Sequence, residues 1–174
     1  MKLSDSRTIR ADINTVWAAL LNPEVLKECV PGCTEMSGSA EDGFEATVVQ
    51  KVGPVKATFK GSVELQNMSP PTSVTIVGSG KGGAAGFAKG EANVRLETDG
   101  DATVLHYEVE AKVGGKLAQL GSRIIDGFAK KMAEQFFTRF QEAIEEPGEN
   151  DEAVSDSDQK GEVPNKGWFK KLVG

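Results

Sequence analysis

The sequence predicts an α+β fold in which a curved antiparallel β-sheet lies against one long C-terminal helix. Apolar and polar residues alternate through much of residues 33–113, which is typical of antiparallel strands with one buried face. After residue 115, apolar residues recur every three or four positions, which indicates an amphipathic helix. Because the apolar faces of sheet and helix each need a partner, the helix is expected to cross the sheet.

The first thirty-odd residues predict a strand followed by two short helices. Residues 2–10 form the expected first strand. Asp12 is a suitable cap for a short helix whose apolar residues fall on one side. Asn22 is expected to cap a second helix, with Pro23 at its first position, where no backbone N–H is required. This second helix is expected to end near Pro31-Gly32.

Five later segments predict strands, and turn residues separate several of them. The turns are expected at Gly53-Pro54, Pro70-Pro71 and Asp99-Gly100-Asp101. The clearest alternation falls in residues 44–48, 55–66, 74–76, 88–96 and 105–111.

The C-terminal helix is expected to start after Gly114-Gly115 and to continue for about 28 residues, enough to cross a sheet. Its apolar stripe consists of Leu117, Leu120, Ile124, Phe128, Met132, Phe136, Phe140 and Ile144.

Length and composition suit a single domain of residues 1–145 followed by a tail. The chain has 174 residues, 39% of them hydrophobic, and no apolar run approaches the ~20 residues of a membrane span. The N-terminal residues lack the apolar region of a secretory signal, so a cytoplasmic location is expected. The net charge of −6 argues against nucleic acid as a partner.

The tail divides into two predicted parts. Residues 146–164 are mostly acidic and polar and are expected to form a disordered linker. Residues 165–174 place aromatic and aliphatic side chains beside lysines, a composition that suits an anionic membrane interface. Folding back onto the domain and docking into a partner protein remain alternatives. The expected contact residues are Lys166, Trp168, Phe169, Lys170, Lys171 and Leu172.

Two motifs that suggest chemistry are better explained structurally. Cys29 and Cys33 flank a Pro-Gly turn, and with His106 as the only histidine they are expected to be free thiols rather than metal ligands. The stretch Gly78–Gly83 matches G-x-G-x-x-G, but no helix is predicted after it to receive a pyrophosphate. It is expected to be a flexible glycine-rich hairpin. No catalytic constellation and no metal site are predicted.

Small residues on the predicted inner face of the sheet indicate a cavity. A sheet packed tightly on a helix normally presents larger side chains, so alanines and glycines leave volume that an apolar ligand can fill. The alternative is that the sheet curves and its small residues let the helix approach closely. The small inward residues are Ala46, Ala57, Gly61, Ala88, Gly90, Ala92 and Ala111.

Three stretches give the chain a resemblance to a known family. They are residues 11–33, which end in Pro31-Gly32-Cys33, the segment Gly86–Gly90, and residues 113–127. In these stretches the chain resembles the CoxG family, a small accessory component of carbon monoxide dehydrogenase. That family belongs to the START-like (SRPBCC) superfamily, whose helix-grip fold matches the architecture expected above.

The resemblance implies a non-catalytic accessory protein of a molybdenum hydroxylase. It implies an apolar ligand, with a respiratory quinone, menaquinone, favoured over other lipids, and no covalently bound cofactor. The expected partners are the hydroxylase and the inner face of the cytoplasmic membrane, contacted peripherally from the cytoplasm. The alternatives are a recruitment or assembly factor without a ligand and a START-like cyclase or hydrolase.

The expected ligand site combines the small inward residues with apolar residues of the long helix. Tyr107 is the one inward polar side chain identified from the sequence. The residues expected to line the ligand are Ala57, Phe59, Gly61, Ala88, Gly90, Val94, Tyr107, Leu120, Ile124 and Phe128.

Overall fold

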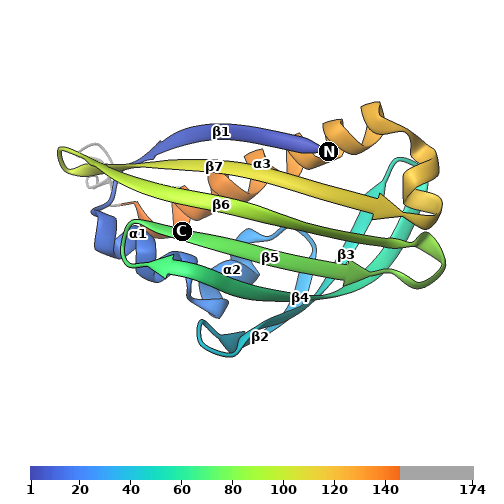
Figure 1. The fold of residues 1–174 in the computed structure, drawn as a ribbon, viewed down its shortest axis with the longest axis horizontal. Coiled ribbons are helices and arrows are strands. Elements are labelled where there is room, and N and C mark those ends of the chain that lie inside the picture. The colour runs from blue at the N-terminus through green and yellow to red at the C-terminus, as the bar shows by residue number, and fades with distance from the viewer. Residues whose placement is uncertain (146–174) are drawn as a thin grey trace, which may run out of the picture. The chain divides into compact units, whose positions relative to one another are not determined.

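The computed structural model describes residues 1–145 and confirms the α+β architecture (Figure 1). The predicted linker and terminal segment, residues 146–174, lie outside the described residues. The elements are β1 (Lys2–Ile9), α1 (Ile13–Leu20), α2 (Pro23–Cys29), β2 (Cys33–Ser39), β3 (Gly43–Val52), β4 (Val55–Ser69), β5 (Ser73–Lys81), the 3₁₀ helix η1 (Gly83–Ala85), β6 (Phe87–Asp99), β7 (Ala102–Gly114), the 3₁₀ helix η2 (Gly115–Leu120) and α3 (Ser122–Ile144).

The seven strands form one antiparallel sheet in the order β1-β7-β6-β5-β4-β3-β2. Strands β2 to β7 are each paired with the next strand along the chain, so they form a meander. Strand β1 then pairs with β7, which places the first and last strands side by side (Figure 1). The expected alternation is present, because one face of each long strand is exposed and the other is buried or half-buried.

Strand β5 is longer than the sequence suggested. The alternation at Val74 and Ile76 continues through Gly78 and Gly80, which pair with β4 and β6. These two glycines were expected in a flexible hairpin, and that expectation is wrong. The hairpin is shorter and consists of η1 and its flanking residues Gly82 and Gly86. Sheet pairing outweighs the weak strand preference of glycine here, because both neighbouring strands are long enough to continue the ladder.

The two short helices begin where the sequence predicts. The side chain of Asn22 accepts a hydrogen bond from the backbone N–H of Glu24 at 2.9 Å, and Pro23 opens α2. Asp12 precedes α1, but its carboxylate accepts from the hydroxyl of Thr15 instead of from a backbone N–H. Both helices supply buried residues to the core.

The core is concentrated where α1, α2 and the C-terminal half of α3 meet the sheet, a region called the closed end. Its fully buried side chains are tightly packed, and the hydroxyl of buried Thr103 donates to the carbonyl of Ala11 at 2.8 Å. Arg7 of β1 donates to Gln141 of α3 at 2.9 Å, which fixes the end of the helix to the edge of the sheet. The largest fully buried residues are Phe140, Ile9, Leu105, Val16, Thr103 and Cys29.

The C-terminal helix is shorter than the predicted 28 residues. Leu117 and Leu120 belong to the 3₁₀ helix η2, and α3 begins only at Ser122. Between them Gly121 has φ +91°, a backbone conformation outside the α-helical region. Within residues 1–145, no helix combines the length and apolar character needed to cross a membrane.

Candidate functional site

The inner face of the sheet carries a continuous area of glycine and alanine. In one cross-strand row, Ala46, Gly61, Gly80 and Ala88 are successive partners on β3, β4, β5 and β6. In the next row, Gly78 pairs with Gly90 and Gly90 with Ala111. The small-residue patch is defined here as Ala46, Gly61, Gly78, Gly80, Ala88, Gly90 and Ala111. These positions share the face of buried Phe44, Val74, Val94 and Leu105.

Two glycines of this patch border space that no side chain fills. A Cβ built on Gly78 would meet only Ser62 and Val63 of β4, each at 3.5 Å. A Cβ built on Gly80 would meet only β4 backbone, at 3.8 and 3.9 Å. No atom of α3 lies within 4 Å of either position. The helix therefore does not rest on this part of the sheet, which favours a cavity over close helix approach.

The other two glycines of the patch are constrained by neighbouring strands. A Cβ on Gly61 would lie 2.9 Å from the carbonyl oxygen of Ser79, and one on Gly90 would lie 2.5 Å from that of Glu110. Such approaches require glycine because real Cβ atoms do not come so close to backbone. Gly61 and Gly90 thus shape the sheet, whereas Gly78 and Gly80 leave volume above it.

Apolar side chains of η2 and α3 border the same space opposite the sheet. Leu120 and Ile124 contact the β3–β4 turn, where a Cβ on Gly53 would lie 3.5 Å from the Ile124 side chain. Ile124 is 40% exposed, and Phe128, one turn further along α3, is half-buried. By contrast, Phe137 and Phe140 near the other end of α3 are buried. The helix is therefore packed at the closed end and open toward its N-terminus.

Aromatic side chains separate this open region from the core. Tyr107 stacks on Phe137 with ring centroids 5.0 Å apart, and Phe136 packs edge-on against Phe137 at the same distance. The guanidinium of Arg7 lies 5.6 Å from the Phe137 ring centroid. Burial, together with the negative charge of Asp5, raises the pKa of the Tyr107 hydroxyl. Tyr107 therefore stays protonated and acts as an aromatic surface with one polar tip.

The structure places the ten predicted ligand residues in three groups. Ala57, Phe59, Gly61, Ala88 and Gly90 lie on the inner face of β4 and β6, and the Phe59 ring lies over Gly82. Leu120, Ile124 and Phe128 lie on η2 and α3. Val94 and Tyr107 are cross-strand partners next to the closed end, where Val94 is already in the core.

Sequence reasoning missed Gly78 and Gly80 as site residues. The period-two pattern that starts at Val74 and Ile76 reaches both glycines and was a usable signal. The tail residues Lys166, Trp168, Phe169, Lys170, Lys171 and Leu172 lie outside the described residues.

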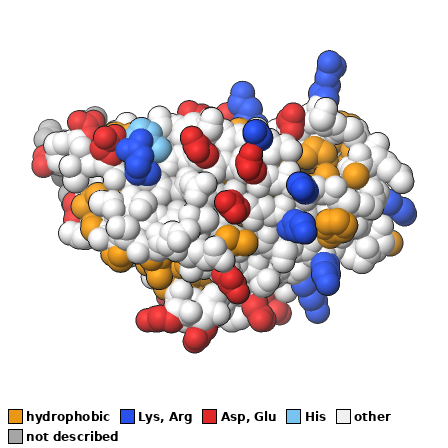
Figure 2. Space-filling model, in the orientation of Figure 1, with side chains coloured by type: hydrophobic (Ala, Val, Ile, Leu, Met, Phe, Trp, Pro, Cys, Tyr) orange, Lys and Arg blue, Asp and Glu red, His pale blue; other side chains and the backbone are white. Residues whose placement is uncertain are grey.

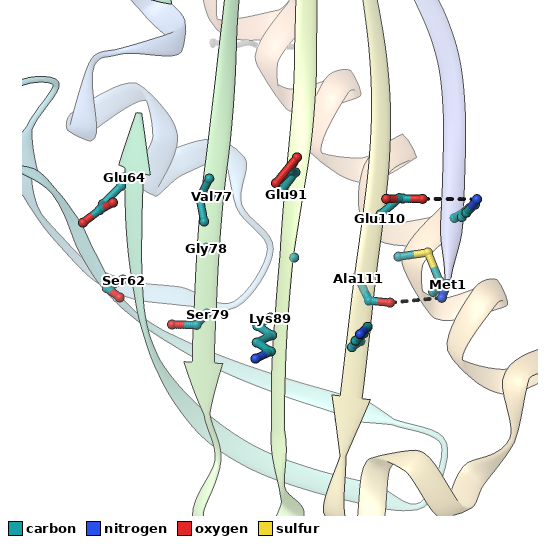
Figure 3. Close-up of a pocket in the computed structure, with 13 residues that line it drawn as sticks. Met1, Ser62, Glu64, Val77, Gly78, Ser79, Lys89, Glu91, Glu110 and Ala111 are labelled. Carbon is teal, nitrogen blue, oxygen red and sulfur yellow. Dashed lines mark hydrogen bonds and ion pairs between the residues drawn. The ribbon is translucent and has the colours of Figure 1, made fainter. Parts of the chain in front are cut away.

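The outer face of the sheet is polar and presents a shallow trough rather than an apolar cavity. His106 lies on this face and its Nε2 is 3.0 Å from Glu97, whose pKa the hydrogen bond lowers. Figure 2 shows acidic and basic side chains in separate areas of this face. The trough, of about 660 Å³, lies between Glu64, Glu91 and Glu110 on one side and Lys89 on the other (Figure 3).

No metal site is formed by residues 1–145, in which no three His, Cys, Asp or Glu side chains gather. Cys29 is buried and Cys33 is half-buried, and both are free thiols, as expected. Burial raises the pKa of each thiol, that of Cys29 to about 11. A raised pKa disfavours the reactive thiolate, which argues against a redox or nucleophilic role for either cysteine.

Solved structures share this fold. A conserved protein from Geobacillus kaustophilus is 29% identical over 83% of this chain and 95% of its own, with a TM-score of 0.77. Proteins from Chromobacterium violaceum and Thermus thermophilus are 14% and 12% identical, each matching 83% of this chain. They are covered over 98% and 97% of their lengths, both with a TM-score of 0.61.

The family comparison agrees with the resemblance seen in the sequence. No curated protein matches the chain. The model of the family described as the G-type subunit of carbon monoxide dehydrogenase (CoxG) matches residues 6–145, which include every strand but the start of β1, and all the helices. This match covers most of the chain and the whole of the small-residue patch. The chain therefore belongs to the CoxG family of carbon monoxide dehydrogenase subunits.

Proposed function

We propose that this protein binds one apolar ligand, a respiratory quinone with menaquinone favoured, between the small-residue patch and the N-terminal half of α3. One observation carries the proposal: no α3 atom comes within 4 Å of a Cβ built on Gly78 or Gly80. An apolar space of this kind takes an apolar ligand more readily than water, because water there lacks hydrogen-bond partners. The partly exposed Phe128 and Ile124 would lose contact with water when a ligand covers them.

Family membership suggests the setting in which such a ligand is used. The name of the family associates it with carbon monoxide dehydrogenase. A quinone carried by an accessory protein would take electrons from the cytoplasmic molybdenum enzyme to the respiratory chain. In this proposal the protein works at the inner face of the membrane as a peripheral partner of the hydroxylase, and residues 165–174 supply one of its contacts.

A catalytic role finds less support among the described residues. An enzyme of this fold needs an acid or base at the cavity, and burial keeps Tyr107 protonated. Asp5 and Arg7 share the inner face with Tyr107 but lie on the edge strand β1. Arg7 is already held by Gln141 and Phe137. These residues therefore have structural roles, and the proposal is of a binding protein, not an enzyme.

The test is to identify what the purified full-length protein carries. Native mass spectrometry and organic extraction should recover a quinone or lipid, and added menaquinone should bind in detergent solution. Gly80→Val should lower occupancy because it fills space beside the patch. Its fold should survive, since the new Cβ makes only ordinary contacts.

Ser79→Val is the matched control, because Ser79 is exposed on the opposite face of the same strand. The control should bind menaquinone like the wild type. A wild-type protein that yields no apolar ligand and binds no added menaquinone would contradict the proposal. The family role would then be that of a recruitment or assembly factor without a ligand.

A further inference from the structure

Positive charge is concentrated at the end of the sheet where the ligand space opens. Three segments build this end: residues 46–63 around the β3–β4 turn, 79–90 around η1, and 111–125 around η2. They contain no acidic residue, although the chain carries a net charge of −6. Figure 2 shows the lysines gathered at this end of the molecule, with apolar side chains among them. The basic residues are Lys51, Lys56, Lys60, Lys81, Lys89, Lys112, Lys116 and Arg123, called the basic end.

The lysines of the basic end are arranged at a cost to the fold. Lys60 is the direct cross-strand partner of Lys81, and Lys89 is that of Lys112. Like charges placed opposite each other destabilise an antiparallel pair. Among residues 1–145, none of these four lysines forms an ion pair that would offset the repulsion. An arrangement that folding alone does not favour indicates an anionic partner.

An exposed aromatic ring lies among these lysines. Phe87 is 44% exposed on the outer face, between Lys81 on one side and Gly114 on the other. Its ring lies directly over Gly114, where any side chain would collide with it. The ring is therefore held at the surface by the backbone beneath it. Ile124, also partly exposed, lies on α3 just beyond η2, which follows Gly114 directly.

We infer that the basic end docks on an anionic membrane surface and turns the opening of the ligand space toward the bilayer. Lysines around an exposed apolar side chain match the interface of an anionic bilayer, where cations meet headgroups and the ring enters the acyl boundary. The choice of a membrane over an acidic protein rests on the proposed function, since an apolar ligand resides in the bilayer. This contact is separate from the one predicted for residues 165–174.

The test compares vesicle binding by full-length charge variants. Lys89→Glu with Lys112→Glu should weaken binding to phosphatidylglycerol-containing vesicles by at least about tenfold, because each lysine near such a surface contributes about fivefold. Lys130→Glu with Lys131→Glu is the matched control, with the same charge change on exposed positions of α3. Phe87→Ser should also weaken binding, whereas Phe87→Trp should preserve or strengthen it. Binding should fall with added salt and with pure phosphatidylcholine.

Two further measurements separate this inference from the proposed function. The Lys89→Glu, Lys112→Glu variant should still bind menaquinone in detergent solution, which also shows that it is folded. Vesicle binding that is equal in this variant and in the control variant would overturn the docking inference, as would equal binding to neutral and anionic vesicles. Wild-type protein that docks through these lysines but carries no apolar ligand would overturn the proposed function alone.

Discussion

Cys29 is a buried acid whose ionisation the folded protein suppresses. The side chain is fully buried, and burial, reinforced by the charge of Glu28, raises its pKa from 9.0 to about 11. Arg139 acts in the opposite direction but does not offset the burial. Between these two values the unfolded chain releases the thiol proton and the folded chain keeps it. Since the unfolded state then binds fewer protons, stability must fall as the pH rises through this window.

Urea unfolding as a function of pH tests this expectation. The pKa difference at Cys29 corresponds to roughly 2–3 kcal/mol of stability lost between about pH 9 and pH 11. The Cys29→Ala variant lacks this contribution, so its unfolding free energy should fall less over the same range. Lysines and Tyr107 titrate in both proteins and cancel in the comparison. Parallel pH profiles for the two proteins would show that Cys29 is not the group responsible.

The glycines show how much individual residue identities leave open. Gly61, Gly78, Gly80 and Gly90 all lie on the inner face of the sheet. Two of them admit a neighbouring carbonyl and two leave space, yet the sequence presents all four as glycine. The difference depends on the distance between strands and on where α3 lies, and neither quantity has a local signal. The presence of a cavity could therefore be predicted, but not which glycines border it.

At the scale of elements, the junction between η2 and α3 determines where the long helix begins. Leu117 and Leu120 continue the three-residue spacing of the α3 stripe, so a pattern of apolar residues does not distinguish the 3₁₀ turn from an α-helix. The break depends on Gly121, whose φ +91° and ψ 158° belong to a region that is essentially restricted to glycine. Isolated glycines also occur inside helices, as Gly127 does, so the sequence alone predicted one continuous helix.

A pair of glycine-to-alanine variants distinguishes these two roles. Gly121→Ala should destabilise the protein by about 1–3 kcal/mol, because alanine is strained in this backbone conformation even though space around it is open. Gly127→Ala should stabilise by about 0.5–1 kcal/mol, because it removes backbone freedom from a helical position with nothing within 4 Å. Urea unfolding measures both. Equal effects of the two substitutions would mean that residues 117–144 form one uninterrupted helix.

For most elements the sequence was sufficient because the pattern and the fold agree. The period-two segments became strands, and Asn22-Pro23 began α2 as its capping residues indicate. Strand β5 was underestimated because its final residues are glycines, which carry neither apolar alternation nor strand propensity. Their pairing is imposed by β4 and β6, so it is a property of the sheet rather than of the segment.

At the scale of the whole domain, packing is strongest at one end and ligand space lies at the other. Thr103, Phe140 and the Arg7–Gln141 hydrogen bond fix the closed end. The opposite end combines the N-terminal half of α3, the η1 and η2 turns and the basic end. A protein built this way can open for an apolar molecule without disturbing its core, because local stability follows the density of buried contacts.

Amide hydrogen exchange should reveal this division along α3. Without ligand, residues 122–132 should exchange faster than residues 134–144, because Ile124 is exposed and Phe128 only half-buried, while Phe137 and Phe140 are buried. Added menaquinone should slow exchange in residues 122–132, and in β5 around Gly78 and Gly80, since the ligand would stabilise the closed arrangement of these elements. The Gly80→Val variant should lose most of this ligand effect and keep the slow exchange of residues 134–144. Protection by menaquinone that appeared only at the closed end would place the ligand elsewhere and would contradict the site described above.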